Sequence, residues 1–253
     1  MPEKDTAYTR EGTLAHAMAE AILRTFLANG LDYVPEKYEY LATSHHLLEQ
    51  RDACLAEGLD WKEMAETVYE HYCRIVYETY LGAKLEDPDA VLLIEARLRL
   101  DEFIPDGFGS SDAVIIYNDT LEVFDLKYGK GVKVDADHNP QMMCYALGAL
   151  CGPGETYLIN TVRMTIIQPR LRHESSWAMS ADELIKWANN TLKPAALASY
   201  GRDAERQWIF LSSALKGLEK CGSEHAKFYD DYLKNLINTP VGNVIAQRLM
   251  REM

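Results

Sequence analysis

The chain has 253 residues, 47% of them hydrophobic, which is enough to form a sizeable core. Its 39 acidic and 26 basic residues give a formal net charge of −13. That charge argues against a passive nucleic-acid coat, since such proteins bind through cationic side chains; a divalent metal ion and a local basic patch can still attract phosphate. No segment approaches the roughly 18 apolar residues of a membrane span, and residues 1–10 are polar, so we expect a cytoplasmic protein without membrane contact.

The cysteines are widely spaced and form no CxxC pair. They are Cys54, Cys73, Cys144, Cys151 and Cys221. This spacing favours neither a zinc knuckle nor a disulfide framework, so we expect reduced and mostly buried thiols.

Apolar residues at helical spacing dominate the first third of the chain. Thr9 is suited to cap a helix over residues 10–29. A second helix is expected over residues 44–57. A third is expected over residues 60–82, where Glu63 completes a capping pair with the residue at its start. We expect these helices to pack against the rest of the protein.

The pattern changes at Val91, where apolar and charged residues begin to alternate with the period of a strand. Two more strands are expected over residues 111–117 and 121–127, both rich in Val and Ile. The residues between them, 118–120, have the composition of a hairpin turn. Because both strands are apolar on both faces, this hairpin should lie inside a covered sheet.

Alternating elements continue after a loop at residues 129–137. Asn139 and Pro140 are suited to be the N-cap and first residue of a helix that ends near Gly152. Strands are expected over residues 156–160 and 162–168, a helix from a capping box at Ser180 and Glu183 toward Ser199, and further helices after Arg202.

The strongest chemical signal is the pair Asp112 and Asp125. A two-residue turn at Asn118 and Asp119 places the two carboxylates directly opposite each other on one face, whereas a three-residue turn separates them. Facing like charges destabilise a strand pair. A cation between them removes that repulsion, and oxygen ligands suit Mg²⁺ or Mn²⁺.

Lys127 lies two residues beyond Asp125 and therefore on the same side of the strand. Its ammonium group can hold a nucleophilic water or stabilise a phosphoryl transition state, while a metal ion activates the water. Together these residues suggest a hydrolytic site. The alternative is an exposed strand end carrying an ordinary Lys–Asp surface pair.

Two helices offer further site residues. His16 and Glu20 are four residues apart and share a helix face, as do Gln141 and Tyr145. The first pair can add to a metal shell and the second lies where a helix start favours an anion. A hydrogen-bonded packing histidine and ordinary helix surface polarity are the alternatives. Glu95 is either a further ligand or part of a solvated ladder of paired charges.

A group of cations follows the same strands and can form a phosphate-holding patch, or simply solvate the surface. These residues are Lys130, Lys133, Arg163, Arg170 and Arg172.

Four motifs occur in a fixed order. They are Gly12-Thr13-Leu14-Ala15-His16 with Glu20, Gly109-Ser110-Ser111-Asp112, Asp125-Leu126-Lys127-Tyr128-Gly129-Lys130-Gly131, and Asn139-Pro140-Gln141 with Tyr145. Their combination resembles the RecB-like branch of the PD-(D/E)XK nuclease superfamily. The closest likeness is to a phage- and prophage-borne family of that branch, whose members also show a stretch like Gln168-Pro169-Arg170. The resemblance covers about residues 9–200.

The resemblance implies an α/β fold, with a mixed central β-sheet flanked by helices and helical additions at both ends. We expect a single nuclease domain over residues 1–253. Its helical N-terminal part covers about residues 9–82, its sheet core about 91–170, and its helical C-terminal part about 180–253.

The resemblance also implies roles for individual residues. His16, Asp112 and Asp125 would hold Mg²⁺ or Mn²⁺ together with the carbonyl of Leu126, and Lys127 would be the catalytic lysine. Gln141 and Tyr145 would organise the site or the substrate strand. Many relatives carry clustered cysteines near the C-terminus, but residues 208–221 retain only Cys221, so no iron–sulfur cluster is expected.

The function expected from these residues is metal-dependent hydrolysis of phosphodiester bonds in DNA. The enzyme would be exonuclease-like or would act on single-stranded or branched DNA in phage replication or recombination. The substrate would be single-stranded DNA or a duplex end, and a homo-oligomer or a phage recombination partner is compatible with the family. The rival hypothesis is a DNA-binding or recombination scaffold on a nuclease fold. Whether Glu20 or Glu95 joins the metal site stays open at this point.

Overall fold

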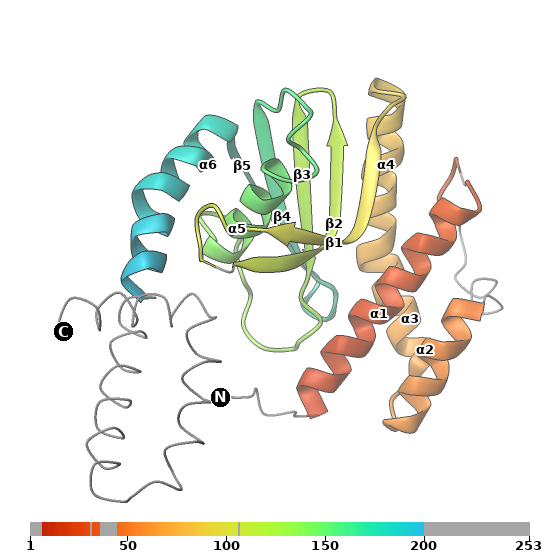
Figure 1. Ribbon diagram of the computed structural model, residues 1–253. Coiled ribbons are helices and arrows are strands. Elements are labelled where there is room, and N and C mark those ends of the chain that lie inside the picture. Colours follow the sequence, from red (N-terminus) through yellow and green to blue (C-terminus); the bar gives the residue numbers. More distant parts are fainter. Residues whose placement is uncertain (1–6, 31, 36–44, 106, 200–253) are drawn as a thin grey trace, which may run out of the picture. The chain divides into compact units, whose positions relative to one another are not determined.

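The computed structural model describes residues 7–30, 32–35, 45–105 and 107–199. It is an α/β structure in which a five-stranded mixed sheet is flanked by helices (Figure 1), as the sequence predicted. The chain divides into two compact units. Residues 1–99 and 108–184 form one unit, and residues 100–107 and 185–253 form the other. The expected single domain over residues 1–253 stays a prediction.

The N-terminal helices agree with the sequence pattern. They are α1 (Ala7–Ala28), α2 (His45–Ala56), α3 (Trp61–Val68), the π-helical segment η2 (Tyr69–Cys73) and α4 (Arg74–Glu86). The Asp60 side chain caps α3 by accepting from the backbone N–H groups of Lys62 and Glu63. The expected Thr9 cap is wrong, because α1 begins at Ala7 and Thr9 therefore lies inside its first turn. No helix in the described part of the chain is long and apolar enough to cross a membrane.

The sheet follows chain order. Its strands are β1 (Val91–Arg99), β2 (Phe108–Tyr117), β3 (Thr120–Leu126), β4 (Thr161–Gln168) and β5 (His173–Ser180). Neighbouring strands are antiparallel except β3 and β4, which are parallel and joined through α5 (Pro140–Leu150). The Asn139 side chain caps α5 by accepting from the N–H groups of Gln141 and Met142, and Pro140 is its first residue. Both predictions at this helix start are confirmed.

Both faces of the sheet are covered, which explains why the central strands are apolar on both sides. On one face, buried residues of the sheet such as Ile115, Phe124 and Ile167 join the core formed by α1 to α4. On the other, α5 lies against β1 to β4 (Figure 1) and buries Met142 and Leu147. The site described below lies where these two layers meet one end of the sheet.

The β2–β3 hairpin has the register that the sequence predicted. Tyr117 pairs with Thr120 around a two-residue turn, and Ala113 pairs with Phe124. Asn118 occupies the first turn position with a φ of 46°, a left-handed conformation that Asn tolerates better than most residues. One step beyond the Ala113–Phe124 pair, this register brings Asp112 opposite Asp125.

Two expectations for the later strands need correction. The strand predicted over residues 156–160 is absent, because the chain there makes successive turns closed by backbone bonds such as Tyr157 N–H to the Gly154 carbonyl, 2.9 Å. Asn160 instead fastens this segment to the hairpin turn, with its backbone N–H 2.8 Å from the Asp119 carbonyl oxygen. The edge strand β5 was not predicted. Its exposed and less exposed residues alternate, but its Ser and Glu content hid the pattern.

The capping box at Ser180 and Glu183 is confirmed. The Ser180 backbone N–H donates to Glu183 Oε2 at 3.1 Å, and the Glu183 N–H donates to Ser180 Oγ at 3.2 Å. The helix that follows comprises α6 (Ala181–Trp187), the π-helical segment η4 (Ala188–Leu192) and residues 193–199. The helices expected after Arg202, and Cys221 with them, lie outside the described residues.

The turn residue Asn118 gives a test of the hairpin register. Replacing Asn118 with Val should lower the free energy of unfolding by about 1–2 kcal/mol, because a β-branched residue resists a positive φ. Asn118→Gly is the matched control and should be close to wild type, since Gly adopts this conformation freely. Urea unfolding followed by circular dichroism measures both. Equal stability of the Val and Gly variants would contradict the left-handed turn.

Candidate active site

Three carboxylates occupy neighbouring positions on three adjacent strands. In the register of β1 and β2, Ile94 pairs with Ala113 and Ala96 with Ser111, which leaves Glu95 opposite Asp112. Asp125 follows on β3. Glu95 has a φ of 50° in the middle of β1, a conformation that non-glycine residues avoid in strands and that is found at functional sites.

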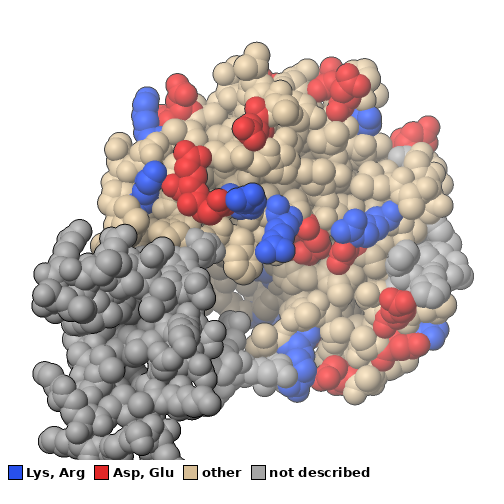
Figure 2. Space-filling model, in the orientation of Figure 1, with Lys and Arg blue, Asp and Glu red and all other residues tan. Residues whose placement is uncertain are grey.

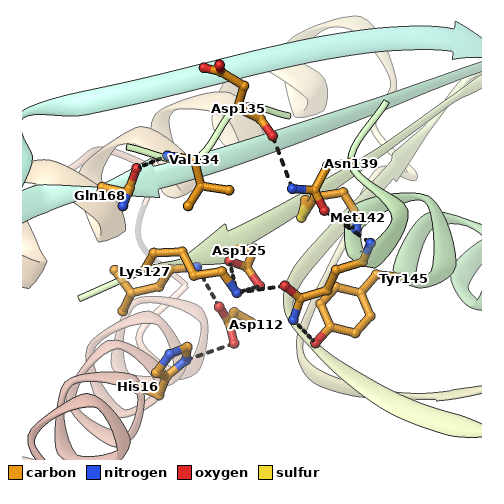
Figure 3. Close-up of polar contacts among 12 residues, drawn as sticks. His16, Asp112, Asp125, Lys127, Val134, Asp135, Asn139, Met142, Tyr145 and Gln168 are labelled. Atoms are coloured by element: carbon orange, nitrogen blue, oxygen red, sulfur yellow. Dashed lines mark hydrogen bonds and ion pairs between the residues drawn. The ribbon is translucent and has the colours of Figure 1, made fainter. Parts of the chain in front are cut away.

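His16 completes a group with two of these carboxylates. Ligand atoms of His16, Glu95 and Asp112 all lie within 4.8 Å of one another. His16 Nδ1 is 2.9 Å from Asp112 Oδ1 (Figure 3), so α1 presents its histidine directly to β2. Glu95 therefore lies beside His16 and Asp112, as a further ligand would, and its membership of the metal site stays a prediction. The strained backbone at Glu95 breaks the strand alternation on which the alternative of a solvated charge ladder rested.

The donor set of this group suits a hard divalent cation. Two carboxylates and one imidazole supply mostly oxygen donors with one nitrogen, a set that Mg²⁺ and Mn²⁺ accept. Opposite ligands of an ion with bonds of about 2.1 Å lie about 4.2 Å apart. The spacing within 4.8 Å is close to that value, so small side-chain adjustments are enough for His16, Glu95 and Asp112 to share one ion.

The second oxygen of Asp112 is bound by the sheet itself. Asp112 Oδ2 accepts from the Leu126 backbone N–H at 2.6 Å. Asp112 is only 15% exposed, and this bond fixes its carboxylate between β2 and β3. Leu126 was expected to offer its carbonyl to a metal; in the structure its N–H orients one of the ligands, and the role of its carbonyl stays a prediction.

Asp125 lies beside this group but is paired with Lys127. Lys127 Nζ donates to Asp125 Oδ1 at 3.1 Å and lies 2.9 Å from Oδ2 in an ion pair. Asp125 Oδ2 is buried and has no hydrogen-bond donor of suitable geometry. A buried acceptor of this kind favours a nearby cation. That Asp112 and Asp125 share one ion stays a prediction, because Asp125 is not among the three residues whose ligand atoms converge.

The α5 residues extend the network outward. Lys127 Nζ donates to Gln141 Oε1 at 3.0 Å, and Gln141 Nε2 donates to the Tyr145 hydroxyl at 2.8 Å. Gly109 makes room for Tyr145, since a Cβ there would lie 3.3 Å from the tyrosine ring. These side chains therefore contact one another and the site, which a helix surface of unrelated polar residues would not do.

Burial and the charge of Asp112 raise the affinity of its two carboxylate neighbours for protons. Burial, and then the charge of Asp112, raises the pKa of Glu95 to about 7. Burial and the Asp112 charge likewise raise the pKa of Asp125 to about 6, against the opposing effect of Lys127. For His16, burial lowers the pKa, but the hydrogen bond and charge of Asp112 outweigh it, so the net shift is upward. The site therefore attracts positive charge, whether from protons or from a metal ion.

Some residues that the sequence singled out lie elsewhere. Glu20 pairs with Arg24 at 2.7 Å and stays outside the converging group. Of the five cations, Arg163 lies near Glu122, 3.6 Å away, while Lys130 and Arg170 line one pocket and Arg172 another. The expected patch is thus divided. On the face shown in Figure 2, basic and acidic side chains are interspersed over the described residues.

Gln168 is a residue whose structural importance the sequence reasoning missed. It is 3% exposed, and its amide binds the loop after β3 at two points. Gln168 Oε1 accepts from the Val134 N–H at 2.7 Å (Figure 3), and Nε2 donates to the Val132 carbonyl at 3.1 Å. An amide side chain at the end of an otherwise apolar strand was the available signal. Its effect is to fix the loop that leaves the active-site strand.

A comparison with protein families gives a match over most of the chain. The model described as "Protein of unknown function (DUF2800)" matches residues 1–208. The chain therefore belongs to the DUF2800 family. The matched span includes every residue of the network described above.

The raised pKa values predict how stability depends on pH when no divalent metal is present. The free energy of unfolding should fall as the pH rises from about 4 to about 7, because folded Glu95 and Asp125 hold protons that the unfolded chain has already released near pH 4. Glu95→Gln and Asp125→Asn should each flatten this slope. Urea unfolding in EDTA at several pH values measures it.

The exposed residue Glu155 supplies the control for this experiment. Glu155→Gln removes a carboxylate away from the site and should keep the wild-type slope. Wild-type slopes in both site variants would show that the carboxylates do not interact as the geometry indicates.

Proposed function

We propose that this member of the DUF2800 family is a metal-dependent nuclease that hydrolyses phosphodiester bonds in DNA. It would be exonuclease-like or would act on single-stranded or branched DNA in the cytoplasm. The observation that carries the proposal is the convergence of His16, Glu95 and Asp112 ligand atoms within 4.8 Å, beside a lysine held by Asp125 and Gln141. The likeness of the four motifs to RecB-like nucleases supports the same assignment.

The converging group would hold the ion. When bound there, Mg²⁺ or Mn²⁺ would supply Lewis acidity toward a phosphate oxygen and toward water. Asp112 would be the best-fixed ligand, because the Leu126 N–H holds its carboxylate in place before any ion arrives. Glu95 is added to the ligand set that the sequence suggested, and Asp125 would face the ion from the neighbouring strand.

Lys127 is placed to contact the reacting phosphate. Its ammonium group has three hydrogens, of which Asp125 and Gln141 can accept two. The third can be donated to a phosphate oxygen or to the attacking water, where a fixed positive charge stabilises the negative charge that develops in the transition state. Asp125 orients the ammonium group, while Gln141, itself held by Tyr145, limits the positions it can take.

The rival hypothesis, a scaffold that has lost activity, explains less of this geometry. A protein without a bound cation gains nothing from three carboxylates on adjacent strands, whose charges oppose one another. It also gains nothing from the strained φ of 50° at Glu95. Both features favour a site that functions with a cation in place.

Metal binding can be tested separately from catalysis. Mn²⁺ should bind the wild-type protein saturably in calorimetric titration, and Asp112→Asn or Glu95→Gln should weaken it by at least about tenfold, since each removes a charged ligand. Glu155→Gln is the control and should titrate like wild type. A scaffold without a site would give no saturable heat. EDTA should abolish cleavage of single-stranded DNA by the wild-type enzyme.

Lys127 should act in turnover and not in metal binding. Lys127→Ala should keep Mn²⁺ and DNA binding but lose about a hundredfold or more in single-turnover cleavage rate. Lys127→Arg should also be slow, because the planar guanidinium cannot replace a compact ammonium group held by Asp125 and Gln141. Lys133→Ala, an exposed lysine on the following loop, is the control. Wild-type rates for Lys127→Ala would refute the assignment of this lysine.

A further inference from the structure

A small pocket adjoins the candidate active site. It has a volume of about 70 Å³ and lies between the first turns of α1 and the segment that follows β3. Gly12 on its helical side precedes His16 by one turn, about 6 Å along the helix axis. Lys130 on its other side follows Lys127 by three residues. The pocket thus borders the elements that carry the histidine and the lysine of the site.

The polar lining of the pocket is positively charged. Arg170 Nη1 donates to Glu11 Oε1 at 2.6 Å, and the guanidinium lies 5.0 Å from the centroid of the Tyr128 ring. Both contacts hold Arg170, which is 14% exposed, in a fixed position. Lys130 is exposed at the pocket and adds a second cation. Two cations and one carboxylate leave a net positive charge in a chain whose total is −13.

The Gln168-Pro169-Arg170 stretch builds much of this pocket. Gln168 fixes Val132 and Val134 of the loop that also carries Lys130. The next three residues form a 3₁₀ turn, Pro169–Leu171, that places Arg170 against Tyr128 and Glu11. One short motif therefore supplies Arg170 and fixes part of the loop that carries Lys130, although none of its residues belongs to the converging metal-ligand group.

Gly12 leaves the pocket open on the side of α1. Glycine inside a helix is unfavourable relative to alanine, yet a Cβ at Gly12 would meet no atom within 4 Å. Packing within the described part of the chain thus gives no steric reason for glycine at this position. A glycine at this position would instead allow a ligand to approach the helix backbone closely.

We propose that this pocket binds a phosphate group of the DNA strand next to the scissile bond. The inference rests on the proposed nuclease function and assigns part of its substrate path. The pocket's volume of about 70 Å³ leaves space for a small group such as a phosphate. Arg170 and Lys130 would donate charge-assisted hydrogen bonds to the phosphate oxygens. The phosphate is an internal one or the terminal one of a DNA end.

The test measures binding of single-stranded oligothymidylate in EDTA, so that the metal site takes no part. Fluorescence anisotropy of a 3′-labelled strand compares a 5′-phosphate with a 5′-hydroxyl form. Lys130→Ala should raise the Kd about tenfold, the effect of losing one charge-assisted hydrogen bond. Gly12→Ala should raise it similarly by filling the space, and should fold at least as stably because alanine favours a helix. Lys133→Ala, on the same loop but outside the pocket, is the matched control.

The outcomes separate the two phosphate sources. Equal losses with both strands assign an internal phosphate, whereas a loss confined to the 5′-phosphorylated strand assigns a terminal one. The proposal is overturned if Lys130→Ala and Gly12→Ala bind like wild type, or if Lys133→Ala loses as much as Lys130→Ala. Cleavage with Mn²⁺ is measured in parallel. If the wild type binds DNA through the pocket but does not cleave it, only the nuclease function is refuted. If Lys130→Ala and Gly12→Ala bind and cleave like wild type, only the pocket is refuted.

Discussion

The Asp112 carboxylate joins three elements that are far apart in the sequence. One oxygen contacts His16 on α1 and the other accepts the Leu126 N–H on β3, while the residue itself belongs to β2. Removing this side chain would separate the histidine from the sheet and leave a backbone N–H at the end of a buried strand without its acceptor, which is costly. Because α1 and the hairpin are both anchored in the core, the site rests on rigid elements, as accurate positioning of ligands requires.

The same arrangement is electrostatically unfavourable until a cation arrives. Glu95, Asp112 and Asp125 occupy neighbouring strands, and burial together with the charge of Asp112 raises the pKa of Glu95 to about 7 and that of Asp125 to about 6. The left-handed backbone at Glu95 adds strain. Lys127 relieves part of the repulsion by pairing with Asp125. The repulsion that remains among the carboxylates favours binding of a proton or a metal ion. The same carboxylates thus lower the stability of the fold and raise the affinity of the site for positive charge.

Local sequence signals predicted the parts of this structure that depend on neighbours in the chain. The turn at Asn118 set the hairpin register, and Asn139 and Pro140 marked the start of α5. The position of Glu95 could not be read in this way, because its alternation with Arg97 is that of an ordinary solvated strand and a positive φ leaves no local signature. The sequence also did not predict the Gln168 contacts, since they join residues 34 and 36 positions apart. For His16, one histidine on a helix is ambiguous, and only the resemblance favoured a ligand.

Charge distribution constrains how the proposed enzyme would hold DNA. With a net charge of −13, the long-range field of the chain repels a polyanion. The described residues on the face in Figure 2 have interspersed charges and form no broad basic surface there. Affinity must then come from a few cations that lie next to the chemistry, such as Lys127, Lys130 and Arg170. Few phosphate contacts release few counterions, so binding would depend only weakly on salt. An enzyme of this kind holds DNA mainly where it cuts, which suits a strand end or a locally exposed single strand better than a long duplex.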